Sequence, residues 1–205
     1  MRGAILIAAA ALLALSGRSG RAAESAAAVP IAALNNALVG AMHAGKETPF
    51  AARYAALAPI VERTFDLPAV LEASVGPRWA SLPPQQQADL QAEFTRFTVA
   101  SYVANFNSFG GETFTILPEI RASGAEQVVS TQIVPTTGDA AKLDYVMRQE
   151  PAGWRAVDVL LDGTISRAAV QRSDFRSLIT GDDAQRLIAS LRKKVAVLSG
   201  GAQLP

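Results

Sequence analysis

The spacing of apolar residues changes its period at Gly110 and Gly111, and this change constrains the fold more than any other feature of the sequence. Before the two glycines, apolar residues recur every three or four positions, which indicates amphipathic helices. After them, apolar and polar residues alternate in short runs separated by glycine or proline turns, which indicates strands. Helical spacing returns after Gly163. The sequence therefore predicts helices, then a sheet, then helices again.

Four helices are expected before the double glycine and two after the last strand. Prolines mark several of the starts, because proline suits the first turn of a helix. Asp66 is expected to cap the third helix and Asp182 the last one. The longest helix has a wide apolar stripe, which needs cover over more than a third of its circumference. The expected helices begin near residues 30, 49, 66, 84, 168 and 182. The longest one covers about residues 84–107, and the one that begins at residue 168 is expected to reach residue 179.

Four strands are expected between Gly111 and Gly163, and the short turns between them imply antiparallel neighbours. Their alternating residues lie at 113–120, 129–133, 142–148 and 154–161. The predicted fold is therefore α+β, with a four-stranded antiparallel sheet packed against several helices. A curved sheet under broadly apolar helices can close tightly or leave a gap. A gap lined by Phe, Val and Leu stays dry and accepts apolar ligands.

The N-terminal region has the layout of a secretory signal peptide. A short positive start is followed by 12 apolar residues, from Ala4 to Leu15, and then by a polar stretch. Twelve helical residues cover roughly 18 Å, too short for a hydrocarbon core about 30 Å thick. We therefore interpret residues 1–22 as a signal peptide and residues 23–205 as one domain. An uncleaved membrane anchor is the alternative.

The net charge and the absence of cysteine limit which cellular locations and which ligand classes fit the sequence. Loss of Arg2, Arg18 and Arg21 with the signal peptide leaves 16 basic and 18 acidic residues, a net charge of −2. A slightly acidic protein is a poor nucleic-acid binder. The chain has no cysteine, so disulfides and a lipid-modified cysteine are excluded. A periplasmic location fits these features best.

Few residues offer chemistry. The one histidine, His43, has no Gly-x-Ser-x-Gly turn to accompany it, and a general base needs a nucleophile within reach. Asp158 and Asp162 would share a strand face about 13 Å apart, too far for a retaining glycosidase pair. Asp158 is instead expected to accept a hydrogen bond from nearby backbone or an arginine. We predict no catalytic residue, no metal site and no cofactor.

Two groups of residues resemble one known family, the periplasmic MlaC family, also called the toluene-tolerance auxiliary family. The first group is Phe65-Asp66-Leu67-Pro68, Gly76, Trp79, Leu82, Gln85–Gln87, Phe94 and Tyr102. The second is Gly153-Trp154-Arg155-Ala156-Val157-Asp158-Val159, Asp162-Gly163, Ser166 and Arg176. Within the family, residues 161–166 and 171–176 are most similar to the hopanoid-associated HpnM branch.

The resemblance implies a soluble periplasmic lipid carrier. Such a carrier exchanges lipid with a membrane-bound ABC transporter complex and with an outer-membrane partner, and it touches the membrane surface transiently. The cargo would be a phospholipid, or a hopanoid for the HpnM branch, held between the sheet and the helices. The resemblance transfers no catalytic residue.

From the helical stripe and the strand alternation we predict the wall of a lipid pocket. The predicted wall consists of Phe94, Phe97, Val99, Tyr102, Val103, Phe106, Phe114, Ile116, Ile133, Tyr145, Met147, Val157, Val159 and Leu161. We interpret Arg192–Lys194 as a solvated helix end near the negative end of the helix dipole, with contact to anionic headgroups or a partner as the alternative.

Two other functions remain open at this point. An isomerase or hydrolase acting on an apolar substrate would need a buried carboxylate beside a tyrosine. Asp144 and Tyr145 are the one adjacent pair, and strand alternation points them to opposite faces. An assembly or accessory factor for a membrane lipid enzyme would carry no cargo, and its sheet and helices should pack without a cavity.

Overall fold

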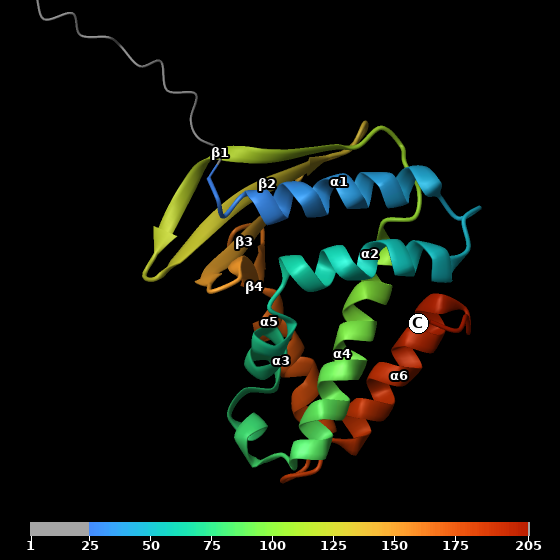
Figure 1. Cartoon of the computed structure of the whole chain (residues 1–205), viewed down its shortest axis with the longest axis vertical. Coiled ribbons are helices and arrows are strands. Elements are labelled where there is room, and N and C mark those ends of the chain that lie inside the picture. Colours follow the sequence, from blue (N-terminus) through green and yellow to red (C-terminus); the bar gives the residue numbers. More distant parts are fainter. Residues whose placement is uncertain (1–24, 205) are drawn as a thin grey trace, which may run out of the picture.

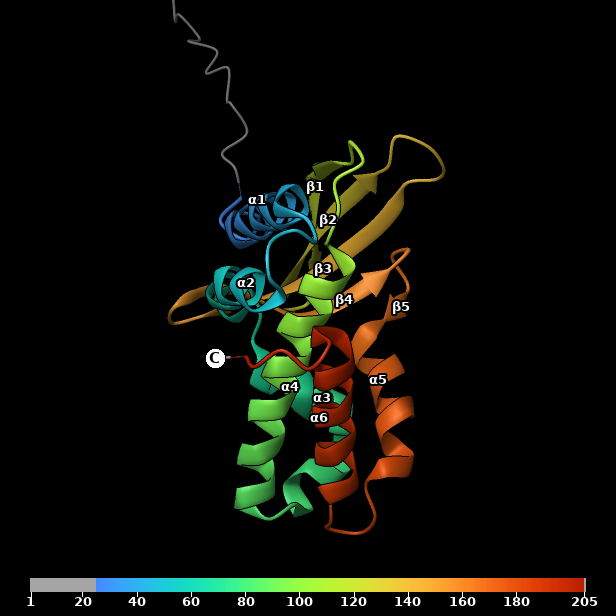
Figure 2. The same ribbon diagram turned by 90° about the vertical axis from the view of Figure 1, so that its right-hand side faces the viewer.

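The computed structural model describes residues 25–204, so the predicted signal peptide lies outside the described residues. Two layers can be distinguished in this part of the chain (Figure 1). In the upper layer, α1 (Val29–Ala44) and α2 (Phe50–Thr64) pack beside an antiparallel sheet. Below it, α3 (Leu67–Val75), α4 (Pro84–Asn105), α5 (Arg167–Phe175) and α6 (Gln185–Ser199) form a bundle (Figure 2). None of the described helices is both long and apolar enough to cross a membrane.

The helix boundaries follow the signals in the sequence at most ends. Asp66 caps α3 as predicted, because its Oδ1 accepts a hydrogen bond from the backbone N–H of Ala69 at 3.1 Å. Gly76 ends α3 with φ of 73°, a conformation that glycine adopts without strain. The chain then forms a 3₁₀ helix, Gly76–Ser81, before α4 begins at the expected proline. The longest helix ends at Asn105, two residues earlier than predicted.

The C-terminal helices depart from the prediction. Residues 168–179 were expected to form one helix, but α5 ends at Phe175 and a 3₁₀ turn covers Arg176–Leu178. Asp182 does not cap α6, which begins at Gln185. The backbones of Thr180 and Asp183 exchange two hydrogen bonds of 3.0 Å, and this small bridge holds Asp182 in a turn ahead of the helix.

The sheet has five strands in the order β1-β2-β3-β4-β5, all antiparallel, rather than the four predicted. The strands are β1 (Thr113–Ser123), β2 (Glu126–Val134), β3 (Ala141–Glu150), β4 (Gly153–Leu161) and β5 (Ile165–Ser166). The fifth strand could not be predicted from the sequence, because two residues are too few to show an alternation of apolar and polar side chains. It turns the chain back along β4 and starts α5 directly afterwards.

One face of the sheet is covered by helices, and the apolar side chains of this face form the core. Tyr145 and Met147 of β3 are buried there, together with Val129 of β2. Leu34 of α1 and Val61 of α2 are completely buried in the same core. Burial of such side chains contributes roughly 1.5–3 kcal/mol each.

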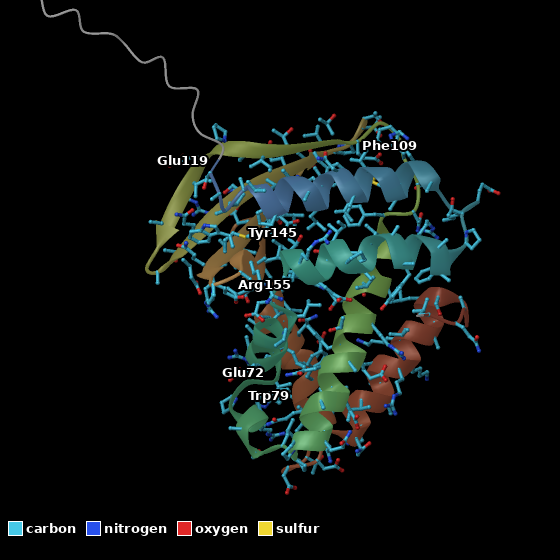
Figure 3. The ribbon with its side chains drawn as sticks, viewed as in Figure 1. Glu72, Trp79, Phe109, Glu119, Tyr145 and Arg155 are labelled. Carbon is cyan, nitrogen blue, oxygen red and sulfur yellow. The ribbon has the colours of Figure 1, made fainter. Side chains whose placement is uncertain are left out.

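The segment between α2 and α3 joins the helices to the sheet. The backbone N–H of Asp66 donates to the carbonyl of Ala156 on β4 at 2.9 Å, beside a parallel bridge between Phe65 and Ala156. Arg155 lies at this junction (Figure 3). Its Nη2 donates to the carbonyl of Phe65 at 2.6 Å, and its Nη1 lies 3.3 Å from the carboxylate of Glu150. The bundle is therefore anchored directly on β4.

Candidate functional site

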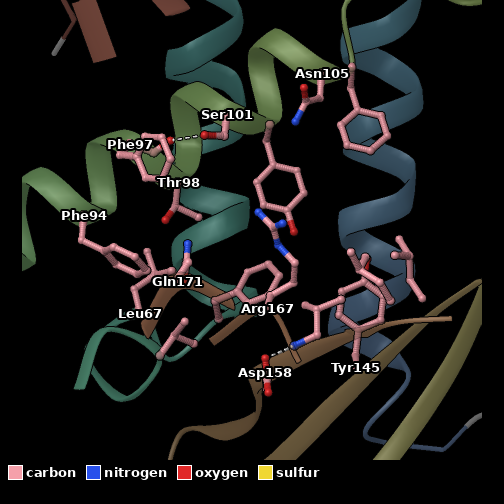
Figure 4. A pocket seen from close by; sticks show the side chains of 17 residues that line it. Leu67, Phe94, Phe97, Thr98, Ser101, Asn105, Tyr145, Asp158, Arg167 and Gln171 are labelled. Carbon is pink, nitrogen blue, oxygen red and sulfur yellow. Dashed lines mark hydrogen bonds between the residues drawn. The ribbon is translucent and has the colours of Figure 1, made fainter. Parts of the chain in front are cut away.

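A cavity of about 330 Å³ lies where α4 and α5 meet the sheet (Figure 4). The volume is at the lower end of the range for small-molecule sites, about 300–1,000 Å³. Most of the wall is apolar or aromatic. It is formed by Phe65, Leu67, Val70, Phe94, Phe97, Thr98, Ser101, Tyr102, Asn105, Phe106, Leu143, Tyr145, Asp158, Val159, Leu161, Arg167 and Gln171.

One face of α4 supplies the longest wall. Phe94, Phe97 and Tyr102 of α4 all line the cavity, and so does Phe106 directly after the helix. The rings of Tyr102 and Phe106 stack with centroids 6.0 Å apart. This face was predicted from the apolar stripe, and the structure places all four of these residues at the cavity.

The valines of the same stripe lie elsewhere. Val103 follows Phe94 by nine residues, which is two and a half helical turns, so these two side chains point in opposite directions from α4. Val99 and Val103 are completely buried, and neither is among the residues that line the cavity. Nη1 of Arg53 on α2 donates to the carbonyl of Val103 at 2.9 Å. The two valines support the packing of α4 and do not line the cavity.

The sheet contributes one patch from two neighbouring strands. Leu143 pairs with Leu161, and Tyr145 pairs with Val159, across β3 and β4. All four side chains line the cavity. Of these, Leu143 was not predicted as a wall residue, although it alternates with Tyr145 in the sequence, and that register would have identified it.

The remaining predicted sheet residues do not reach the cavity. Phe114, Ile116 and Ile133 belong to β1 and β2, and Phe114 pairs with Ile133. Met147 is completely buried in the core. Val157 lies at a register shift between β3 and β4. The strand pattern identifies the face of the sheet, but it does not identify which part of that face stays uncovered.

The polar side chains around the cavity were not predicted as wall residues, because the apolar periodicity does not distinguish them from other polar residues on helix surfaces. Gln171 of α5 faces Thr98 of α4 in Figure 4, and Arg167 projects from the start of α5. Asn105 and Ser101 come from α4. Phe65, Leu67 and Val70 also line the cavity without having been predicted as wall residues. Their segment has the pattern of a short capped helix, which does not indicate a binding site.

Asp158 has a structural role at the edge of the cavity. Its Oδ1 accepts hydrogen bonds from the backbone N–H of Val159 at 2.8 Å and of Ala168 at 3.1 Å. Its Oδ2 accepts from the hydroxyl of Ser166. The predicted hydrogen bond from backbone to Asp158 is therefore present. Both carboxylate oxygens are engaged in holding the first turn of α5 against β4.

The two tyrosines of the cavity are held in the neutral form. Burial raises the pKa of Tyr145 and of Tyr102 above the ordinary value, and for Tyr102 the neighbouring Tyr145 adds to the rise while Arg167 opposes it. A neutral phenol can donate one hydrogen bond in an otherwise apolar wall. It is not a general base at neutral pH.

The groups considered for catalysis lie apart. Asp144 points away from Tyr145 and forms ion pairs with Arg121 and Lys142 on the opposite face of the sheet. His43 packs against Phe109, with ring centroids 3.9 Å apart. Within residues 25–204, no group of three or more His, Asp or Glu side chains is arranged to hold a metal ion. The cavity therefore offers apolar surface with a polar rim.

Comparisons with known proteins give a match to one family model and to a solved structure. A family model described as MlaC protein matches residues 33–193. A solved structure, described as the phospholipid-binding protein from Ralstonia solanacearum in complex with a phospholipid, matches with a TM-score of 0.72. The match covers 84% of this chain and 98% of that chain, at 18% sequence identity, which shows a shared fold. A comparison with curated proteins gives no significant match.

Proposed function

The chain belongs to the MlaC family, and from this premise we propose that it is a periplasmic lipid carrier whose cargo lies in the cavity between α4, α5 and the sheet. The observation that carries the proposal is the cavity itself. Its wall is built mainly from aromatic and aliphatic side chains, although the surrounding core is closely packed. The phospholipid held by the structural neighbour supports the same ligand class.

The energetics of such a site suit a carrier. Each buried methylene contributes about 0.8 kcal/mol relative to water, so a chain of about 14 carbons contributes roughly 10 kcal/mol before ordering costs. Extraction from a bilayer gains little of this, because the chain moves from one apolar phase to another. The free energy of transfer between bilayer and carrier is therefore close to zero, and a partner protein can set the direction of transfer.

The proposal includes the rest of the transport route. Residues 1–22 direct the chain to the periplasm, and residues 23–205 form the lipid-binding domain. The carrier exchanges its cargo with an ABC-type transport complex of the inner membrane and with an outer-membrane partner. We propose phospholipid as the cargo, with a hopanoid as the alternative from the similarity of residues 161–166 and 171–176 to the HpnM branch.

Seven of the predicted wall residues carry the proposed contact with the lipid. They are Phe94, Phe97, Tyr102, Phe106, Tyr145, Val159 and Leu161, and the structure adds Phe65, Leu67, Val70 and Leu143 to the apolar wall. The aliphatic members give surface without directional bonds, so they accept chains of different length. The tyrosine hydroxyls are the polar exceptions within this wall.

Identification of a bound lipid tests the proposal. The mature protein is purified from the periplasm of its host without detergent, and native mass spectrometry is followed by organic extraction. We expect one phospholipid or hopanoid for each protein molecule. A protein that carries no lipid from the host, and takes none up from vesicles after delipidation, would favour the cargo-free assembly function.

A further inference from the structure

A second hollow adjoins the cavity along α4. It is an open groove of about 520 Å³ between α4 and α6, lined by Phe97, Ser101, Asn105, Ser190, Lys193, Lys194, Val197 and Leu198. Three of these residues, Phe97, Ser101 and Asn105, also line the cavity. They lie four residues apart along α4, so they form one continuous strip between the two hollows.

The groove combines an apolar floor with two ammonium groups. Val197 is 72% exposed, which leaves a branched apolar side chain on the surface of α6. Nζ of Lys194 lies 5.4 Å from the centroid of the Phe97 ring. Since the Phe97 ring also lines the cavity, this one aromatic side chain lies between the ammonium group of Lys194 and the cavity.

Lys193 and Lys194 were predicted to lie at the end of a helix, where the helix dipole would favour them, but they lie before the last turn. Helix α6 continues to Ser199, and its last turn has no basic residue. Arg192 differs from its neighbours, because it is paired with Glu93 at 2.9 Å. Lys193 and Lys194 form no ion pair with any described residue.

Positive side chains outnumber carboxylates around the two hollows. Arg167 stands at the rim of the cavity, also without an ion pair among residues 25–204. In that same part of the chain, the one carboxylate that lines either hollow belongs to Asp158. Both oxygens of Asp158 already accept hydrogen bonds from β4 and the start of α5. An anion in the groove would therefore meet positive charge without a facing carboxylate.

We propose that the groove between α4 and α6 holds the headgroup of an anionic phospholipid whose chain lies in the cavity, with Lys193 and Lys194 contacting its phosphate. This inference rests on the proposed function and names the lipid class: a headgroup of net negative charge is preferred over a zwitterionic one. The strip of Phe97, Ser101 and Asn105 is the route by which the lipid passes from cavity to groove. A hopanoid without charge would gain nothing from these lysines.

Competition between two lipids of equal chain length tests the inference. The delipidated mature protein is incubated with an equimolar mixture of dioleoyl phosphatidylglycerol and dioleoyl phosphatidylcholine, and native mass spectrometry measures the ratio of the two complexes. At low salt we expect about a fivefold preference for phosphatidylglycerol, the ratio given by roughly 1 kcal/mol. The preference should shrink as salt screens the lysines.

A double variant and a matched control locate the effect. K193S/K194S should bring the ratio close to one, because the loss of both lysines lowers the uptake of phosphatidylglycerol more than that of phosphatidylcholine. K46S/R186S removes the same charge from exposed positions on α6 and the loop after α1, and it should keep the wild-type preference. Equal uptake of both lipids by the wild type, or equal loss in both variants, would overturn the headgroup site and leave the carrier function standing. Failure of the wild type to bind either phospholipid would overturn the phospholipid cargo and the headgroup site together.

Discussion

The carboxylate of Asp158 on β4 accepts a hydrogen bond of 3.1 Å from the backbone N–H of Ala168 in the first turn of α5. This contact fixes the helix that carries Arg167 and Gln171 to the rim of the cavity. The position of the rim therefore depends on a polar contact of the sheet, in addition to the apolar packing of the bundle.

Replacement of Asp158 by alanine should loosen α5. The variant loses a cap-like contact, and such contacts contribute about 1–2 kcal/mol. We expect a lower free energy of unfolding in urea and faster loss of bound lipid. Asp182→Ala is the control, because Asp182 caps no helix, and it should change neither quantity. An unchanged rate of lipid loss in Asp158→Ala would show that the position of α5 does not control lipid release.

Filling the cavity should separate binding from folding. Val159 lies on β4 opposite Tyr145 and lines the cavity. A tryptophan there displaces at least two methylenes of the cargo, which corresponds to roughly 1.6 kcal/mol and more than a tenfold loss of affinity. Displacement of a fluorescent fatty acid measures this loss, and circular dichroism checks that the fold is retained.

Val103→Trp provides the contrast to that variant. Because Val103 is completely buried away from the cavity, the larger side chain must overpack α4 against its neighbours and cost about 1–3 kcal/mol or more of stability. We expect a lower thermal midpoint in Val103→Trp and a small change in lipid affinity of the molecules that stay folded. If Val103→Trp lost lipid affinity and Val159→Trp kept it, the lipid would have to lie beside Val103 and not in the cavity.

The buried tyrosine predicts a fall in stability at alkaline pH. Below pH 9 the phenol of Tyr145 is neutral in both the folded and the unfolded chain, so its titration has no effect. The unfolded chain releases this proton at a pKa of about 10, whereas burial raises the pKa of Tyr145 in the folded protein. The folded state then binds the proton more tightly, so the free energy of unfolding falls as the pH rises above 10.

Urea unfolding between pH 8 and 11 measures this fall. Tyr145→Phe removes the titrating group and should give a shallower decline than the wild type. Equal declines in the two proteins would assign the effect to other groups.

The charged cluster on the open face of the sheet should matter for stability and not for cargo. Asp144 is completely buried between Arg121 and Lys142, whose side chains are about half exposed. Asp144→Asn should lower the free energy of unfolding by about 1–3 kcal/mol, because the two remaining cations stay partly solvated. Glu126→Gln breaks the exposed pair with Arg148 and should cost less than about 1 kcal/mol. Lipid affinity should be unchanged in both variants.

Much of the fold could be predicted from the period of the sequence. The switch at Gly110, the prolines before the helices and the Asp66 cap are local signals, and the structure follows each of them. The two-residue strand at Ile165 carries no such signal. Asp182 had the right residue type for a cap, but the bridge between Thr180 and Asp183 delays the helix.

The sequence predicts which residues are apolar and buried, but it does not predict which of them line the cavity. A residue that faces the core and a residue that faces a gap in the core are equally apolar, so Phe94 and Val103 look alike in the sequence. What separates them is which neighbours cover them, and that depends on how α4 is placed against α2, α6 and the sheet. Polar rim residues such as Arg167 depend on the same placement.

Photo-crosslinking tests most directly whether the cavity holds the lipid chain. The delipidated protein is loaded with a phospholipid that carries a diazirine near the end of one acyl chain, irradiated, digested and mapped by mass spectrometry. We expect crosslinks to the segment from Phe94 to Phe106, which covers the end of α4, and to β3–β4 between Leu143 and Leu161. Crosslinks confined to α1, α2 or the charged face of the sheet around Asp144 would contradict a lipid chain in the cavity.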